Sequence, residues 1–121
     1  MRQAVRDPVA AGTFYPADPR RLEGDVLALL EQALPRRAGR PIALVVPHAG
    51  YVYSGATAAM AYAALAPWRS SICRVILLGP THRVAVNGLA LPSVEIFTTP
   101  LGEVRLDGAA IASLKGLPQI V

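Results

Sequence analysis

The chain has 121 residues, of which 53% are hydrophobic and 17% are charged, and its formal net charge is +4. This length predicts a single domain over residues 1–121, and the apolar content is too high for a disordered segment. The basic residues are scattered along the sequence rather than forming one stripe with aromatic residues between them, so we expect no nucleic-acid binding.

Targeting and membrane signals are missing from the sequence. No apolar run reaches the roughly 18 residues that are needed to cross a bilayer, and the N-terminus has no apolar signal core. Cys73 is the only cysteine, so an internal disulfide is excluded. We therefore expect a soluble, cytoplasmic protein with no membrane partner.

The first predicted element is a helix that begins near Asp18. Asp18 is a favourable N-cap residue, and Pro19 suits the first helical position. Apolar residues then recur at helical spacing as far as Ala33, and Pro35 ends the helix.

Two continuous apolar runs, over residues 42–46 and 74–78, predict strands that are buried on both faces, as in a parallel sheet. Between them, small residues from about Gly55 to Leu65 predict a helix that ends before Pro67. This order predicts a βαβ unit with a right-handed crossover, and hence an α/β domain.

The C-terminal part contains three shorter predicted strands. They cover residues 88–91, 94–98 and 103–106, and a short turn separates the last two. Asp107 is placed to cap a last helix that runs to about residue 114.

The two histidines of the chain occupy matching places. His48 follows the predicted strand 42–46, and His82 follows the predicted strand 74–78. If these strands are parallel neighbours, both histidines lie at the carboxyl edge of the sheet, where open α/β sheets bind ligands. Two imidazoles there either share a metal such as iron or copper or serve only as hydrogen-bonding loop residues.

The residues next to the histidines suggest a pocket. Gly50 allows a sharp turn beside His48, and Tyr51 and Tyr53 share one face if the segment is extended. Either phenol then lies in the pocket or simply packs with one hydrogen bond. Ser54 is an N-cap or a pocket residue, and Thr81 orients the turn that carries its histidine neighbour.

Several common catalytic motifs are absent from the sequence. It has no P-loop, no G-x-G-x-x-G after a strand, no G-x-S-x-G and no C-x-x-C. No acidic residue is adjacent to either histidine. Sequence proximity therefore completes no set of two histidines and one carboxylate.

Four segments in this order and spacing resemble the Memo family, whose bacterial and archaeal members are called AmmeMemoRadiSam system protein B. The resemblance runs from about residue 8 to the end of the chain and covers the N-terminal half of complete members. The segments are Ala11-Gly-Thr-Phe-Tyr-Pro16, Val46-Pro-His-Ala-Gly-Tyr-Val-Tyr-Ser-Gly55, Leu78-Gly-Pro-Thr-His82 and Phe97-Thr-Thr-Pro-Leu-Gly102.

The resemblance implies a truncated fold like that of the class III extradiol dioxygenases, with a mixed, largely parallel sheet and flanking helices. In those ring-opening enzymes, two histidines and a carboxylate hold a non-haem iron. By resemblance, His48 and His82 are the two histidine ligands of a divalent metal, iron or copper, and Tyr15, Tyr51 and Tyr53 line the same pocket.

The chain departs from the family pattern at the third ligand. Memo proteins are expected to use a cysteine from their C-terminal part, so we expect the third ligand to be absent from this chain. Cys73 is a poor substitute, because the predicted strand separates it from His82 by roughly 15 Å or more. Arg83 stands where some relatives have a second histidine, and its charge favours an anionic substrate.

Three hypotheses follow for function. The chain is a metal-dependent redox enzyme related to ring-opening dioxygenases, a non-catalytic module that binds a small molecule or peptide, or an inactive truncated fragment. Because the absent half would cover part of the predicted sheet, we expect a homo-oligomer or association with the missing C-terminal half.

Overall fold

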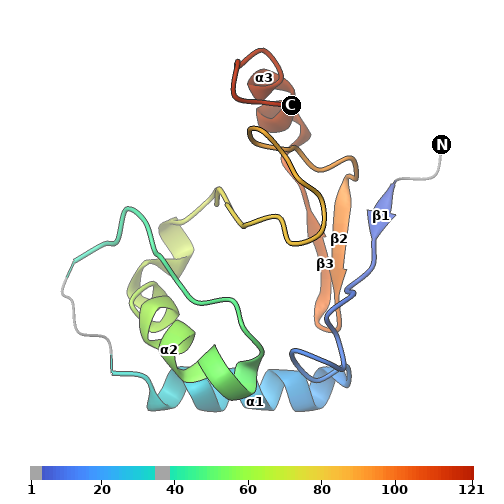
Figure 1. Cartoon of the computed structure of the whole chain (residues 1–121). Helices are drawn as coiled ribbons and strands as arrows, with labels where there is room; N and C mark the ends of the chain where they lie inside the picture. The colour runs from blue at the N-terminus through green and yellow to red at the C-terminus, as the bar shows by residue number, and fades with distance from the viewer. Residues whose placement is uncertain (1–3, 35–38) are drawn as a thin grey trace. The chain divides into compact units, whose positions relative to one another are not determined.

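The computed structural model describes residues 4–34 and 39–121. The chain forms two compact units, one over Val9–Val75 and the other over residues 4–8 with Ile76–Val121. The relative positions of the chain's parts are not determined, so each unit is described by itself (Figure 1).

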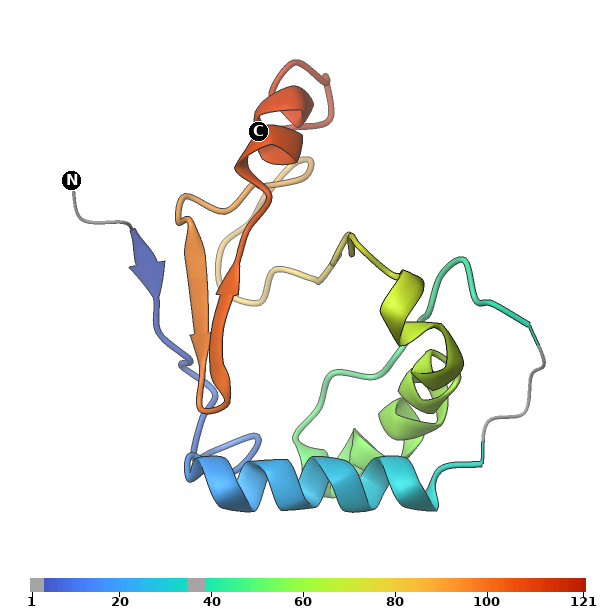
Figure 2. The same ribbon diagram turned by 180° about the vertical axis from the view of Figure 1, so that it is seen from behind.

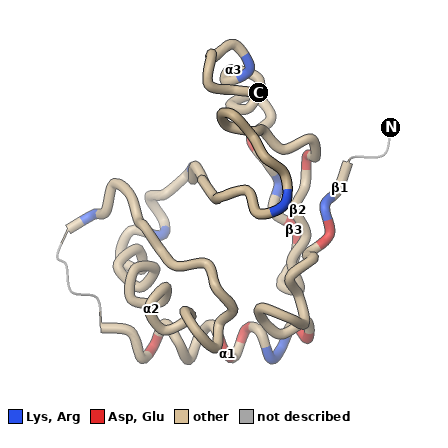
Figure 3. Tube along the Cα trace, in the orientation of Figure 1, with Lys and Arg blue, Asp and Glu red and all other residues tan. Residues whose placement is uncertain are grey.

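The unit Val9–Val75 is built on two helices, α1 (Pro19–Gln32) and α2 (Tyr51–Ala63), followed by a 3-10 helix, η1 (Ala66–Ser71). The helix α1 begins as predicted, because the Asp18 side chain accepts a hydrogen bond of 2.8 Å from the Arg21 N–H. Its predicted stop, Pro35, lies outside the described residues. The two arginines of α1, Arg20 and Arg21, lie in its first turn, and the acidic residues Glu23, Asp25 and Glu31 follow them (Figure 3).

The two helices pack closely because α2 presents small residues to α1. Gly55 and Ala59 are buried in α2, and Leu22 is buried in α1 with 4% of its surface exposed. A Cβ atom on Gly55 would lie 3.1 Å from Cδ1 of Leu29, which is tighter than ordinary packing. Glycine at this position therefore allows the close approach of α2 to α1.

The second unit contains a mixed three-stranded sheet of order β1-β2-β3. The central strand β2 (Ile96–Thr99) pairs in parallel with β1 (Val5–Arg6) and antiparallel with β3 (Gly102–Arg105) (Figure 2). Ile96 is buried, and α3 (Gly108–Leu114) follows the sheet. The predicted hairpin and last helix are confirmed, and Asp107 caps α3 by accepting the Ala110 N–H at 2.9 Å. The α/β class is likewise confirmed.

Three predicted strands are wrong. Residues 42–46 and 74–78 have no strand pairing, so α2 is not flanked by the strands of a βαβ unit. Residues 88–91 make only an isolated bridge, from Leu89 to Ile120. The apolar runs indicated burial, but a strand also needs a neighbouring backbone to exchange hydrogen bonds, and the described residues provide no such ladder for residues 42–46 and 74–78.

The apolar segments that were predicted as strands are largely exposed, although Leu44 and Val46 are half-buried. Val45 has 99% of its surface exposed, and the side chains of residues 75–78 are also mostly exposed. Within the described residues, no helix is both long enough and apolar enough to cross a membrane.

Candidate functional site

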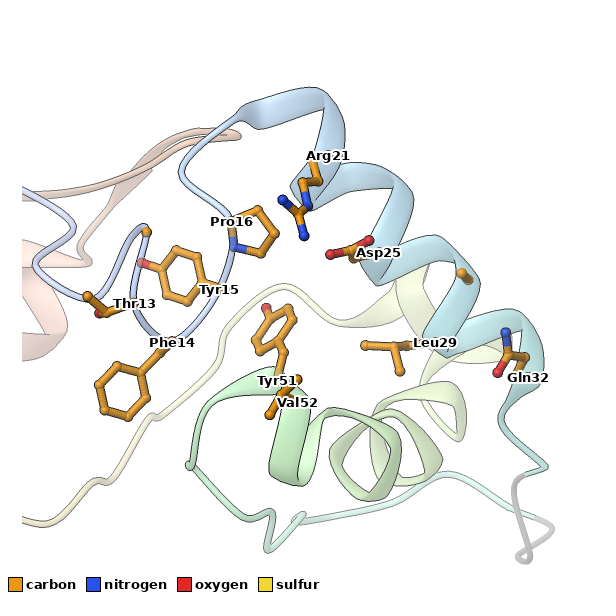
Figure 4. A pocket seen from close by; sticks show the side chains of 12 residues that line it. Thr13, Phe14, Tyr15, Pro16, Arg21, Asp25, Leu29, Gln32, Tyr51 and Val52 are labelled. Atoms are coloured by element: carbon orange, nitrogen blue, oxygen red, sulfur yellow. The ribbon is translucent and has the colours of Figure 1, made fainter.

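A cavity of about 510 Å³ lies within the unit Val9–Val75, between α1, the start of α2 and the turn that precedes α1 (Figure 4). Its volume falls in the range of roughly 300 to 1,000 Å³ that is typical of small-molecule sites. The lining mixes aromatic, aliphatic and charged side chains, and its residues are Gly12, Thr13, Phe14, Tyr15, Pro16, Arg21, Asp25, Ala28, Leu29, Gln32, Tyr51 and Val52.

One wall of the cavity is a hydrogen-bonded turn around Gly12. The φ angle of Gly12 is +82°, which side chains other than glycine rarely adopt, and its N–H donates to the Tyr15 carbonyl at 2.8 Å. The Phe14 N–H donates to the Ala10 carbonyl at 2.9 Å. The Phe14 carbonyl then accepts the Tyr51 N–H at 2.8 Å, which joins the turn to the first residue of α2.

A second wall is one face of α1. Arg21, Asp25, Leu29 and Gln32 follow one another at intervals of four, four and three residues, which places them along one stripe of the helix. Figure 4 shows the side chains of Arg21, Asp25 and Leu29 directed toward the space that the aromatic side chains border. The helix therefore supplies a cation, an anion and an apolar group to one cavity.

Tyr15 and Tyr51 form an aromatic pair at this cavity. Their ring centroids are 5.7 Å apart and their planes are inclined at 42°, a tilted contact within the range of favourable aromatic pairs. Burial raises the pKa of the Tyr51 phenol above its ordinary value of 10.0, and the nearby phenols of Tyr15 and Tyr62 raise it further. The Tyr51 phenol is therefore neutral, and able to donate a hydrogen bond, throughout the physiological range.

The helix α2 begins at Tyr51, four residues earlier than predicted, and this separates Tyr51 from Tyr53. The two tyrosines were expected to share one face only if the segment is extended, and this condition is not met, because residues two apart on a helix do not share a face. Tyr51 lines the cavity, whereas Tyr53 is 85% exposed. Gly50 is the N-cap residue, and the buried Ser54 is not a cap because its hydroxyl donates to the Ala49 carbonyl at 3.0 Å.

The histidines lie in different units. His48 is exposed in the irregular segment before α2, two residues ahead of Gly50. Thr81 and His82 are exposed in an irregular segment of the other unit. Their convergence on one cavity therefore stays a prediction.

The described residues do not assemble a complete set of metal ligands. Across residues 4–34 and 39–121, no three side chains of His, Cys, Asp or Glu come together in a way that could hold a metal ion. The exposed Cys73 thiol points to a local partner, the Ser71 carbonyl at 3.9 Å.

The sequence analysis did not identify Arg21 and Asp25 as site residues. Leu29, which lies on the same face of α1, contacts the position of Gly55 as well as lining the cavity. A signal was present, since the stripe from Arg21 through Asp25 to Leu29 mixes charged and apolar residues at helical spacing. What the sequence did not reveal was the turn at Gly12, which lines the same cavity as that stripe.

Comparison with known proteins adds a family to this geometry. The family model "Memo-like protein" matches residues 6–121. Protein MEMO1 from Danio rerio is 39% identical over 113 residues, which cover 93% of this chain and 37% of that protein. A MEMO1 family protein from Aquifex aeolicus (strain VF5) is 39% identical over 104 residues, covering 86% of this chain and 37% of that protein.

A third relative shows the same relation of lengths. A MEMO1 family protein from Ignicoccus hospitalis is 35% identical over an alignment of 130 positions, which includes 97% of this chain and 44% of that protein. The chain thus spans well under half of the length of these three relatives. The match nevertheless includes nearly the whole chain, and the chain belongs to the Memo-like protein family.

Proposed function

We propose that this chain contributes two imidazole ligands, from His48 and His82, to a divalent-metal pocket. The observation that carries the proposal is the family match over residues 6–121, which includes both histidines and the apolar run before each of them. Neutral imidazole suits iron and copper, the two metals that we expect.

The residues of this chain fit such a metal only in part. An iron site with two histidines needs a third, anionic ligand, and within residues 4–34 and 39–121 no group of three ligands is present. We propose that a polypeptide outside these 121 residues supplies this third ligand. The chemistry that the metal would supply is redox chemistry of the aromatic ring-opening type, as in the class III extradiol dioxygenases.

Metal titration tests this proposal. We expect weak binding of Fe²⁺ and Cu²⁺ under anaerobic conditions, weaker binding in His48→Ala and in His82→Ala, and no turnover of a catechol. Cys73→Ser is the matched control, because this thiol is not among the proposed ligands, and its affinity should equal that of the wild type. Equal metal affinity in both histidine variants and the wild type would exclude the pocket.

A non-catalytic binding module is the second candidate function. The cavity between α1 and the turn at Gly12 favours it, because this cavity is complete within residues 9–75 and has charged and aromatic groups in place. Binding of a small molecule by the chain after complete removal of metal would support this function.

We further propose that another polypeptide covers the exposed apolar segments at residues 42–46 and 75–78. A single-residue exposure of this kind is ordinary, but two contiguous apolar runs are typical of an interaction surface. The greater length of the relatives favours a polypeptide like their remaining sequence as the partner, with a second copy of this chain as the alternative. Light scattering separates the alternatives: self-association supports the second copy, whereas a stable monomer that binds the remaining sequence of a relative supports the first.

A further inference from the structure

The cavity in the unit Val9–Val75 places opposite charges beside an aromatic pair. Arg21 and Asp25 are four residues apart on α1, so their Cβ atoms lie about 5 to 6 Å apart on the same face. Both line the cavity, and Figure 4 shows both side chains directed into it. A ligand that enters therefore meets a guanidinium and a carboxylate within one turn of helix.

We propose that this cavity binds a zwitterionic aromatic amino acid. The Arg21 guanidinium would receive the α-carboxylate, with which it can form paired hydrogen bonds, and the Asp25 carboxylate would receive the α-ammonium. These two ligand groups are joined through a single carbon atom, so one amino acid can reach both side chains at this spacing.

The pairing of charges excludes simpler ligands. A plain carboxylate would meet Arg21 but would be repelled by Asp25, and a plain amine would meet Asp25 but would be repelled by Arg21. A molecule that carries both charges can pair with both groups at once, whereas either simpler ligand pairs with only one. The local charge pattern therefore selects a zwitterion rather than an anion or a cation.

The rest of the lining selects an aromatic side chain. Tyr15 and Tyr51 present aromatic surface at the cavity, with ring centroids 5.7 Å apart, and Leu29 adds an aliphatic surface from α1. An aryl ring can pack on these groups by offset or edge-to-face contact. Because Arg21 and Asp25 are solvent-exposed, each ionic contact is weak, and we expect a dissociation constant on the order of 1 mM.

Three probes with the same ring test the proposal: L-phenylalanine, 3-phenylpropionate and 2-phenylethylamine. They differ in whether both charges, only the carboxylate or only the ammonium is present. Titrations of the full chain with a chelator present, followed by NMR at the Leu29 methyl groups and the Gly12 amide, should show L-phenylalanine binding at least about fivefold tighter than either analogue. Since no metal is present, failure here leaves the proposal for His48 and His82 untouched.

Isosteric variants assign the two charges. In Arg21→Gln the affinity for L-phenylalanine should fall to that for 2-phenylethylamine, and in Asp25→Asn it should fall to that for 3-phenylpropionate. Arg20→Gln and Glu23→Gln are matched controls on α1 whose side chains do not line the cavity, and both should bind like the wild type. Circular dichroism verifies that each variant keeps its helices.

Three results would overturn the proposal. These are equal affinity for the three probes, equal losses in the cavity variants and the controls, and no shift at Leu29 with L-phenylalanine at tens of millimolar. A preference for 3-phenylpropionate would instead assign the cavity to aromatic acids.

Discussion

The helix pair and the segment over residues 42–46 are both rich in apolar residues, yet only the helix pair buries them. In α1, Leu22 is 4% exposed, and in α2 Gly55 and Ala59 are buried, with Gly55 lying beside Leu29 of α1. In the segment, Val45 is almost fully exposed. An apolar pattern therefore indicates a tendency to be buried, whereas burial itself requires a neighbouring element of complementary shape.

Truncation of the buried Leu22 should destabilise the chain more than substitutions at Gly55, Asp18 or Val45. Leu22→Ala should lower the free energy of unfolding by about 2 to 5 kcal/mol, because it removes buried methyl groups and leaves a cavity in their place. This is a large share of the roughly 5 to 15 kcal/mol of a typical domain. Urea denaturation measures it, with the half-exposed Leu27→Ala as the control on the same helix. Equal losses in the two variants would show that Leu22 is no more buried in solution than Leu27.

A second variant tests whether the close approach of α2 to α1 requires glycine at position 55. Gly55→Val should cost about 1 to 3 kcal/mol, because its Cβ alone would lie 3.1 Å from Cδ1 of Leu29 and the added methyl groups crowd the contact further. Gly24→Val is the control, since a Cβ atom at Gly24 of α1 meets nothing within 4 Å. The midpoint of thermal unfolding should be lower for Gly55→Val and unchanged for Gly24→Val. An unchanged midpoint in Gly55→Val would contradict the close approach of the helices.

A third variant weakens α1 without touching its packing. Asp18→Ala should cost about 1 kcal/mol, because it removes the side-chain hydrogen bond of 2.8 Å to the Arg21 N–H. Circular dichroism at increasing temperature should show earlier loss of helix than in Glu23→Ala, which changes an acidic residue of the same helix. If both variants melt together, the cap contributes nothing beyond its charge.

The smallest effect on stability is expected in the exposed segment. Val45→Asp should change the free energy of unfolding by no more than about 0.5 kcal/mol, because the side chain is already in contact with water. The same variant should reduce any self-association seen by light scattering. A loss of 2 kcal/mol or more would mean that residues 42–46 are packed in the chain as it exists in solution.

The sequence predicted the locally determined parts of the fold well. Caps, turns and periodicity within a few residues determine the start of α1, the hairpin of β2 and β3, and α3. The sequence predicted the caps at Asp18 and Asp107 from such local signals. The strand β1 was missed because only two exposed residues form it, and Val5 pairs with Ile96 far along the chain. No local pattern specifies such a contact.

The candidate site was predicted only in part for a similar reason. Tyr15 and Tyr51 were expected to line the pocket of His48 and His82, which stays a prediction, and in the structure they line the cavity beside α1. Tyr51 was grouped with Tyr53 on the assumption of an extended segment. The early start of α2 changed that geometry. The contribution of Arg21 could not be foreseen, because it depends on how the turn at Gly12 meets the face of α1.

The hydrogen bond from the Tyr51 N–H to the Phe14 carbonyl has a consequence for dynamics. The first N–H groups of a helix usually lack a partner within the helix and exchange quickly with solvent. Here the first amide of α2 is protected only while the turn at Gly12 stays docked on it, so its deuterium uptake measures how often the cavity opens. This exchange rate should rise together with that of the Gly12 amide, which shares the same turn, and should respond to ligand even when no side-chain signal changes.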